Sequence, residues 1–239
     1  MADRIFPKRR PTPLRTAGEQ EIQMSFFITF EGIEGSGKTT QIELARQWLE
    51  NEFERPIVVT REPGGCPIAD QIRSTLLDSA NKDMDERTEL LLYAAARAQH
   101  MAERIQPALA EGKPVLCDRF TDATLAYQGY GRGLSIELIE ELNHLATRGV
   151  APDLTILLDF PPESGIKRAR QRNADTTGPD EDRFEKEALA FHHRVRIGYL
   201  ALEHKFPRIR KVEADGPVEE VAARIRIVLQ SFLEDMKTV

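Results

Sequence analysis

The chain has 239 residues, of which 41% are hydrophobic and 30% charged, enough for one sizeable domain with a real core. Its formal net charge of -6 argues against a dedicated nucleic-acid binder, which usually carries an excess of Lys and Arg. No stretch approaches the roughly 18 uninterrupted apolar residues of a membrane span. Two cysteines, Cys66 and Cys117, are too few for a disulfide framework. We expect both to be apolar fillers in a protein of the reducing cytoplasm.

The first 24 residues differ from the rest of the chain. They are basic and broken by prolines between Pro7 and Pro13, and they show no hydrophobic periodicity. They lack the apolar segment of a secretory signal, and their acidic residues and absence of serine argue against a transit peptide. We expect residues 1–24 to be a disordered extension, or to precede a start at Met24. An arm that binds an acidic partner is the alternative.

From Phe26 onward, apolar strands alternate with amphipathic helices. Residues 173–182 are polar and contain Gly178-Pro179, so they are expected to form a mobile loop. The predicted strands are 26–30, 56–60, 115–117, 154–158 and a short strand near 211–212. The predicted helices are about 38–53, 68–77, 85–110, 135–147, 162–172, 184–202 and 217–236.

Strands that alternate with helices indicate an α/β protein, a parallel five-stranded sheet flanked by helices. Ligands of such sheets bind at the carboxyl ends of the strands, and the informative residues of this sequence lie there. We expect one domain over residues 25–239, with a lid around residues 168–182.

A glycine-rich motif follows the first predicted strand and opens the first helix. Its sequence, GIEGSGKT, matches the phosphate-binding pattern G-x-x-x-x-G-K-[ST] in full. Glycines let the backbone curl so that N–H groups point at phosphate oxygens, and the helix adds the positive end of its dipole. In this pattern Lys38 reaches the β- and γ-phosphates of ATP, and the Thr39 hydroxyl binds Mg²⁺. The expected ATP-binding residues are Gly32, Ile33, Glu34, Gly35, Ser36, Gly37, Lys38, Thr39 and Thr40.

This motif identifies a nucleoside triphosphate site but does not choose a reaction, because motors, switches, ATPases and kinases share it. Two carboxylates are candidates for binding Mg²⁺. Asp118 ends the third predicted strand and Asp159 ends the fourth, so each lies at the edge of the sheet where ligands bind. On spacing alone, both remain candidates.

Further motifs follow in a fixed order. They are Thr60-Arg61-Glu62-Pro63-Gly64-Gly65 after the second strand, Asp118-Arg119-Phe120 after the third, Ala126-Tyr127-Gln128-Gly129 beyond it, and Arg168-Ala169-Arg170-Gln171-Arg172 before the polar loop. With these motifs, nearly the whole chain from Phe26 resembles bacterial thymidylate kinases. The resemblance implies the P-loop nucleoside monophosphate kinase fold, and ATP- and Mg²⁺-dependent phosphorylation of dTMP to dTDP in dTTP biosynthesis. It also implies a homodimer packed through helices, to which apolar residues around Leu90–Leu92 would contribute.

The resemblance implies roles in catalysis and metal binding as well. Arg119 would bridge the donor and acceptor phosphates, and Asp118 is favoured over Asp159 as the metal ligand. Gly35 stands where some family members place a basic residue, which is typical of the subtype that supplies this cation from the lid. The implied catalytic residues are Lys38, Arg119, Arg170 and Arg172, and the implied metal ligands are Thr39 and Asp118.

For the acceptor nucleotide, the resemblance implies separate groups for base, sugar and phosphate. Tyr93, where many members carry Phe, would stack on the pyrimidine, while Gln128 would present a donor and an acceptor to its edge. Glu34 would accept a hydrogen bond from the 3′-OH, and Tyr127 would exclude a 2′-OH. The implied substrate-binding residues are Glu34, Arg61, Pro63, Arg73, Tyr93, Arg97, Arg119, Thr124, Tyr127 and Gln128.

Two other functions remain open on the sequence. A kinase for another nucleotide, or for a deoxynucleoside, would keep the phosphate-loop chemistry but bind a different acceptor. A regulatory switch or ATPase would turn over ATP without a nucleoside monophosphate, and would need a partner-binding domain for which the chain has little room. At the level of single residues, Arg73 could be a solvated helix arginine and Tyr93 a core aromatic.

Overall fold

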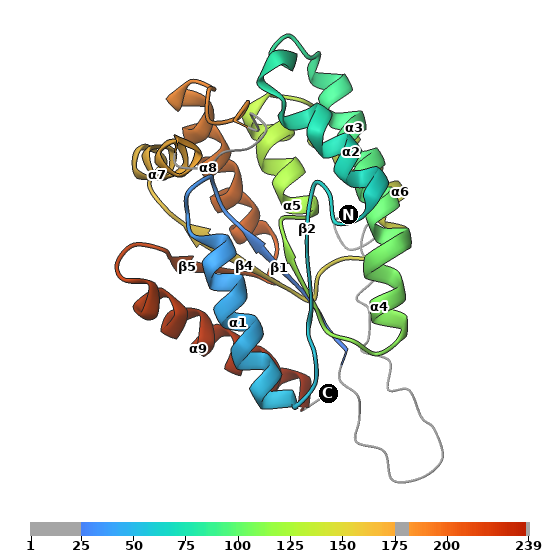
Figure 1. Cartoon of the computed structure of the whole chain (residues 1–239), viewed down its shortest axis with the longest axis vertical. Helices are drawn as coiled ribbons and strands as arrows, with labels where there is room; N and C mark the ends of the chain where they lie inside the picture. Colours follow the sequence, from blue (N-terminus) through green and yellow to red (C-terminus); the bar gives the residue numbers. More distant parts are fainter. Residues whose placement is uncertain (1–24, 175–181, 238–239) are drawn as a thin grey trace.

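The computed structural model describes residues 25–174 and 182–237, without the side chains of residues 172–174. These residues form a five-stranded parallel sheet with helices on both faces, in the strand order β2-β3-β1-β4-β5 (Figure 1). The strands are β1 (Phe27–Glu31), β2 (Val58–Arg61), β3 (Val115–Asp118), β4 (Leu154–Asp159) and β5 (Ile209–Glu213). The predicted α/β class and its five parallel strands are confirmed.

Helical segments connect the strands and cover the sheet. The α-helices are α1 (Lys38–Phe53), α2 (Pro67–Leu77), α3 (Glu86–His100), α4 (Gln106–Ala110), α5 (Thr121–Thr124), α6 (Ile136–Thr147), α7 (Pro162–Ala174), α8 (Leu189–Lys205) and α9 (Val218–Lys237). Three shorter segments are a 3₁₀-helix, η2 (Ser79–Asn81), and two π-helices, η3 (Met101–Ile105) and η4 (Leu125–Gly131).

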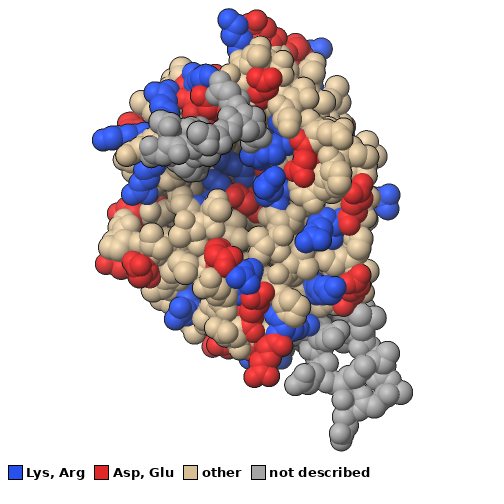
Figure 2. All heavy atoms as spheres, in the orientation of Figure 1, with Lys and Arg blue, Asp and Glu red and all other residues tan. Residues whose placement is uncertain are grey.

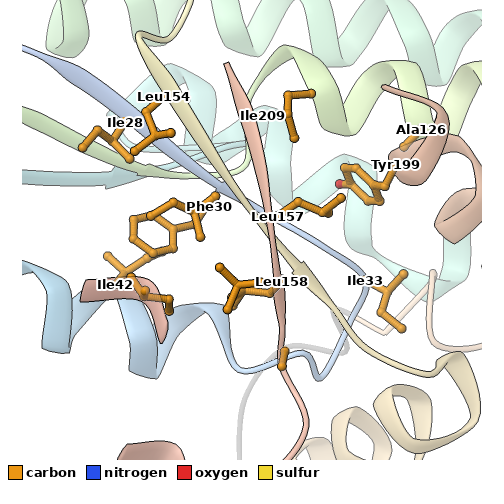
Figure 3. Packing of buried hydrophobic residues seen from close by; sticks show 14 of the residues in the cluster. Ile28, Phe30, Ile33, Ile42, Ala126, Leu154, Leu157, Leu158, Tyr199 and Ile209 are labelled. Atoms are coloured by element: carbon orange, nitrogen blue, oxygen red, sulfur yellow. The ribbon is translucent and has the colours of Figure 1, made fainter. Parts of the chain in front are cut away.

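Strand β1 lies in the middle of the sheet and places side chains alternately on its two faces. Ile28 and Phe30 belong to the core under α1, where Ile42 lies beside Phe30 (Figure 3). Phe27 points to the other face and packs against Phe120, with ring centroids 4.9 Å apart. Apolar groups cover both faces of β1 and hold the strand in place. The position of its carboxyl end, where the glycine-rich loop begins, is therefore fixed.

The helix predicted over residues 85–110 is present but changes its winding. Helix α3 ends at His100, the π-helical segment η3 follows, and α4 completes the helical stretch. In η3, the backbone N–H of Gln106 donates to the Met101 carbonyl, five residues back. Pro107 lacks the amide hydrogen that regular α-helical bonding would need at this point.

The structure contains a helical stretch that the sequence did not predict. Segments α5 and η4 form a continuous helical stretch over residues 121–131. Helix α8 begins at Leu189, not near residue 184, because residues 182–188 form turns.

The predicted disordered extension, residues 1–24, and residues 175–181 of the predicted lid lie outside the described residues. Among the helices that the structure describes, none is long and apolar enough to cross a membrane.

Candidate active site

A cleft of about 1650 Å³ opens at the carboxyl ends of β1, β2 and β3. Sites for a single small molecule usually measure about 300–1,000 Å³, so this cleft has room for more than one ligand. Lys and Arg side chains gather in the hollow (Figure 2). The basic residues that line it include Lys38, Arg61, Arg73, Arg119 and Arg168. Its size and charge suit two phosphorylated ligands.

The order of the strands brings two predicted motifs together. Strands β1 and β3 are direct neighbours, and Phe30 pairs with Asp118 in their register. The backbone N–H of Arg119 donates to the Phe30 carbonyl at 2.9 Å. The loop that leaves β1 at Gly32 and the pair Asp118-Arg119 that leaves β3 therefore begin side by side.

The glycine-rich loop packs directly on helix α7. Gly35 has a φ of 69°, and a Cβ atom there would lie 2.0 Å from the Gly165 carbonyl oxygen. A Cβ atom on Gly165 would in turn lie 2.4 Å from the Glu34 carbonyl oxygen. A side chain at either position would therefore collide with backbone. This contact is a physical reason for glycine at position 35, where some family members place a basic residue.

Lys38, the first residue of α1, lies back against the loop. Its Nζ donates to the carbonyl oxygens of Gly32 at 3.0 Å and Ile33 at 2.9 Å. Burial, followed by the neighbouring Arg119 guanidinium, lowers the pKa of Lys38 to about 8. The ammonium group adds to the positive end of the α1 dipole, where phosphates bind. The predicted ATP-binding residues that line the cleft are Glu34, Gly35, Gly37, Lys38, Thr39 and Thr40, while Gly32, Ile33 and Ser36 are buried within the loop.

Asp118 is placed to hold a cation. Its Oδ1 atom is buried without a hydrogen-bond partner in the part of the chain that the structure describes, and the residue lines the same cleft as Thr39. The two carboxylate oxygens of Asp159 instead accept hydrogen bonds from Arg196, at 2.6 and 2.9 Å. A carboxylate and a hydroxyl fit Mg²⁺, which takes its other ligands from phosphates and water. Residues 25–174 and 182–237 contain no group of three or more His, Cys, Asp or Glu that could hold a metal alone.

Glu34 is a carboxylate held between two predicted site residues. Its Oε1 atom accepts hydrogen bonds from Arg119 Nη2 at 3.0 Å and from the Tyr127 hydroxyl at 2.6 Å. Burial alone would raise the pKa of Glu34, but Arg119, His192, Lys38 and Tyr127 outweigh it and hold that pKa well below its usual range. The Arg119 guanidinium also lies 4.9 Å from the centroid of the Tyr127 ring. Glu34 is therefore an ionised acceptor at neutral pH.

The residues predicted to bind the base line another part of the cleft. Tyr93 is half-buried, and its ring centroid lies 6.5 Å from that of Phe184. Gln128 is buried, and its Nε2 atom donates to Glu89 Oε1 at 2.8 Å. Both residues line the cleft, and the Gln128 amide is only partly engaged by its hydrogen bond to Glu89.

Arg97 is almost completely buried and held mainly by the protein. Its Nε donates to Glu62 at 2.8 Å and its Nη1 to Asn143 at 2.6 Å. Its Nη2 donates to the Phe120 carbonyl and to the Thr124 hydroxyl, both at 3.0 Å. Four of the five N–H groups of the guanidinium thus bind the described chain, so a base carbonyl would be reached through the fifth, on Nη1.

Arg73, which by the resemblance would bind the acceptor phosphate, lies on one wall of the cleft with two other predicted substrate-binding residues. Arg73 Nη1 donates to the Pro63 carbonyl at 3.1 Å. Arg61 Nη2 lies 3.3 Å from Asp70 Oδ1, in an ion pair that is exposed on both sides. The structure therefore brings Arg61, Pro63 and Arg73 together on this wall of the cleft.

The basic cluster on α7 is only partly directed toward the cleft. The described residues that line the cleft include Arg168, whose guanidinium lies 4.3 Å from the centroid of the Phe160 ring, but not Arg170. Arg170 instead donates through Nε and Nη2 to the Glu185 carbonyl, at 3.1 and 2.8 Å. The side chain of Arg172 lies outside what the structure describes.

Several cleft residues were not selected from the sequence. Phe184 packs against Tyr127 with ring centroids 5.6 Å apart, and Glu62 binds the buried Arg97. The available signal for Phe184 was an aromatic residue within Asp182-Arg183-Phe184-Glu185, directly after the polar loop. Glu62 lay inside a quoted motif, but its partner is 35 residues away in the chain.

A phosphate-binding loop after the central strand, with a second polar pocket in the same cleft, is the arrangement of P-loop nucleoside monophosphate kinases. A family model for thymidylate kinase matches residues 30–225. The thymidylate kinase of Syntrophotalea carbinolica is 57% identical over 211 residues, which cover 88% of this chain and 97% of that relative. The thymidylate kinase of Trichlorobacter lovleyi is 59% identical over 208 residues, 87% of this chain and 98% of the relative.

A solved structure of a thymidylate kinase also matches the chain. The crystal structure of thymidylate kinase from Ehrlichia chaffeensis has a TM-score of 0.67 and 35% identity, covering 86% of this chain and 98% of that chain. The chain therefore belongs to the thymidylate kinase family. It is an enzyme, a kinase that phosphorylates dTMP to dTDP, and this confirms the activity and the fold that the motifs implied.

The contact between the loop and α7 gives a prediction for two glycine variants. Gly35 and Gly37 both have positive φ, 69° and 91°, so Gly35→Ala and Gly37→Ala each add backbone strain. Only Gly35→Ala also collides with Gly165, since no described atom lies within 4 Å of a Cβ on Gly37. We expect Gly35→Ala to lose about 1–3 kcal/mol more than Gly37→Ala. The measurement is the free energy of unfolding in denaturant without nucleotide, and equal losses would contradict the proposed packing.

Proposed function

We propose that this enzyme uses ATP as the phosphoryl donor and Mg²⁺ as its cofactor. The observation that carries the proposal is the unpartnered Asp118 Oδ1 among the described residues, in the same cleft as the phosphate-binding loop. Thr39 and Asp118 would hold Mg²⁺, directly or through water. When bound, the ion would neutralise part of the negative charge of the phosphates. Asp159 is left to a structural role with Arg196.

The proposed chemistry depends on position and charge. The acceptor is a phosphate oxygen that is mostly ionised at pH 7, since the second pKa of the phosphate is about 6, so no strong general base is needed. Lys38 would bind the phosphates of the donor, and Arg119 would bridge the two substrates as charge shifts between them. Both cations already lie in the cleft, and Lys38 would exchange at least one of its hydrogen bonds to the loop carbonyls for a phosphate oxygen.

Recognition of dTMP is divided among the predicted substrate residues. Arg61, Pro63 and Arg73 form the wall that would bind its phosphate, and Tyr93 would stack on its base. Arg97, Thr124 and Gln128 would bind the polar edge of the base. Glu34 would accept a hydrogen bond from the 3′-OH, and Tyr127, whose hydroxyl already binds Glu34, would lie where a 2′-OH would be.

The basic cluster of α7 would complete the site when both substrates are bound. Arg170 and Arg172 are proposed to stabilise the transferring group, a role in which one arginine can contribute about 10³–10⁵ in rate. For Arg170 this requires release from the Glu185 carbonyl. Arg168 already lines the cleft and is a third candidate.

We further propose that the enzyme is a cytoplasmic homodimer whose interface includes α3 and α6, two helices in contact. Leu145 is 75% exposed and Leu91 56% exposed, and Leu138 is exposed as well. Leu138 and Leu145 are seven residues apart and share one face of α6. Exposed leucines on adjacent helices suit a second copy of the chain. No nucleic-acid partner is proposed, because the net charge is -6.

The proposed base contact is tested by Gln128→Ala. We expect kcat/KM for dTMP to fall by about 10²-fold or more, because a site built to hydrogen-bond its substrate depends on those bonds. The control is Gln99→Ala, which removes the same amide from the outer part of α3. The two variants are compared by steady-state kinetics with purified protein. Unchanged dTMP kinetics in Gln128→Ala would contradict the proposed contact between Gln128 and the base.

The proposed interface is tested by Leu145→Glu. We expect this charge to split the homodimer, so that light scattering coupled to gel filtration reports the mass of a monomer. Ile227→Glu is the matched control, because Ile227 is 67% exposed on α9, away from the proposed interface. A monomeric wild-type protein at micromolar concentration, or a Leu145→Glu variant that remains dimeric, would contradict the proposal.

A further inference from the structure

Glu89 lies at the centre of a buried polar network beside the base pocket. It belongs to the first turn of α3, and its side chain is 1% exposed. Oε1 accepts from Gln128 Nε2 at 2.8 Å and from Arg132 Nε at 3.3 Å. Oε2 accepts from Arg132 Nη2 at 3.2 Å and from Arg183 Nη2 at 2.6 Å. Two arginines therefore hold the carboxylate, and among the described residues it also accepts from the glutamine of the cleft.

The two arginines keep Glu89 in its ionised form. Burial alone would raise the pKa of this carboxyl, but Arg132, Gln128 and Arg183 lower it below its ordinary value. An ionised carboxylate is an acceptor only. It can therefore face the nitrogen of the Gln128 amide but not the oxygen, which would be repelled at this distance. The amide of Gln128 has one permitted orientation.

The orientation of the amide matters because a flip would exchange the positions of its hydrogen-bond donor and acceptor. With one N–H of Nε2 given to Glu89, Gln128 offers its Oε1 as an acceptor and its second N–H as a donor. Thymine and uracil present a ring N–H beside a carbonyl and match this pair. Cytosine presents a ring nitrogen acceptor beside an amino donor, and it would match only the flipped amide.

We propose that Glu89 is a positioning residue that fixes the Gln128 amide in the orientation that accepts thymine and rejects cytosine. This inference rests on the proposed contact between Gln128 and the base. Glu89 does not touch the substrate itself, and its influence passes through one hydrogen bond. Arg132 and Arg183 act one step further back, because they hold the carboxylate in place.

The test is the ratio of kcat/KM for dTMP to kcat/KM for dCMP in Glu89→Gln. A neutral amide at position 89 can donate as well as accept, so the Gln128 amide can flip. We expect the ratio to fall about tenfold or more, mainly through a gain with dCMP. A role in stability alone would lower both values together and leave the ratio unchanged. Glu86→Gln, the same change at an exposed position of the same turn, should keep the wild-type ratio.

Gln128→Ala separates this inference from the base contact on which it rests. In a Gln128→Ala background, Glu89→Gln should have no further effect on the ratio, because the group through which Glu89 acts is gone. If Gln128→Ala leaves dTMP kinetics unchanged, the base contact itself fails. If Gln128→Ala is impaired but Glu89→Gln keeps the wild-type ratio, only the positioning role is overturned.

A second variant covers the case in which Glu89→Gln does not fold. Glu89→Asp retains the charge that Arg132 and Arg183 bind but withdraws the oxygen from Gln128 by one methylene. We expect a smaller fall in the ratio than for Glu89→Gln, and the melting temperature reports whether the variant is folded. A folded Glu89→Asp protein with the wild-type ratio would overturn the proposal.

Discussion

The site depends on the parallel pairing of β1 with β3. In that register Phe30 lies opposite Asp118, so the phosphate-binding loop and Asp118-Arg119 leave the sheet together. Apolar packing on both faces of β1 holds the pairing in place. A shift by one residue would turn each side chain to the opposite face and separate the two motifs. The geometry of the cleft is thus a consequence of core packing.

Around this edge, three glutamates are paired with arginines. Glu34 lies against Arg119, Glu62 binds Arg97, and Glu89 binds two arginines. Such pairs contribute little net stability, since desolvation offsets their attraction, but removal of one partner is costly. Their effect here is to fix the directions of donors and acceptors before a ligand arrives. A site organised in this way stabilises charge with little rearrangement.

Local sequence patterns predicted the strands, the phosphate-binding loop and most helices, because hydrophobic period and glycine spacing are local properties. The stretch 121–131 was missed because its η4 part winds as a π-helix and does not follow the 3.6-residue period. Long-range partners could not be predicted either. Glu89 meets Arg183 across 94 residues, and Arg170 meets the Glu185 carbonyl only because of how the chain folds after α7.

The most direct measurement is turnover of the purified protein with ATP and Mg²⁺ against dTMP, dUMP, dCMP, UMP, AMP and GMP, followed as ADP formation. We expect robust turnover with dTMP, weaker turnover with dUMP and almost none with the others. We also expect loss of activity when Mg²⁺ is removed by a chelator. Preference for another monophosphate would contradict the base pocket described above, and turnover without any acceptor would contradict the proposed transfer.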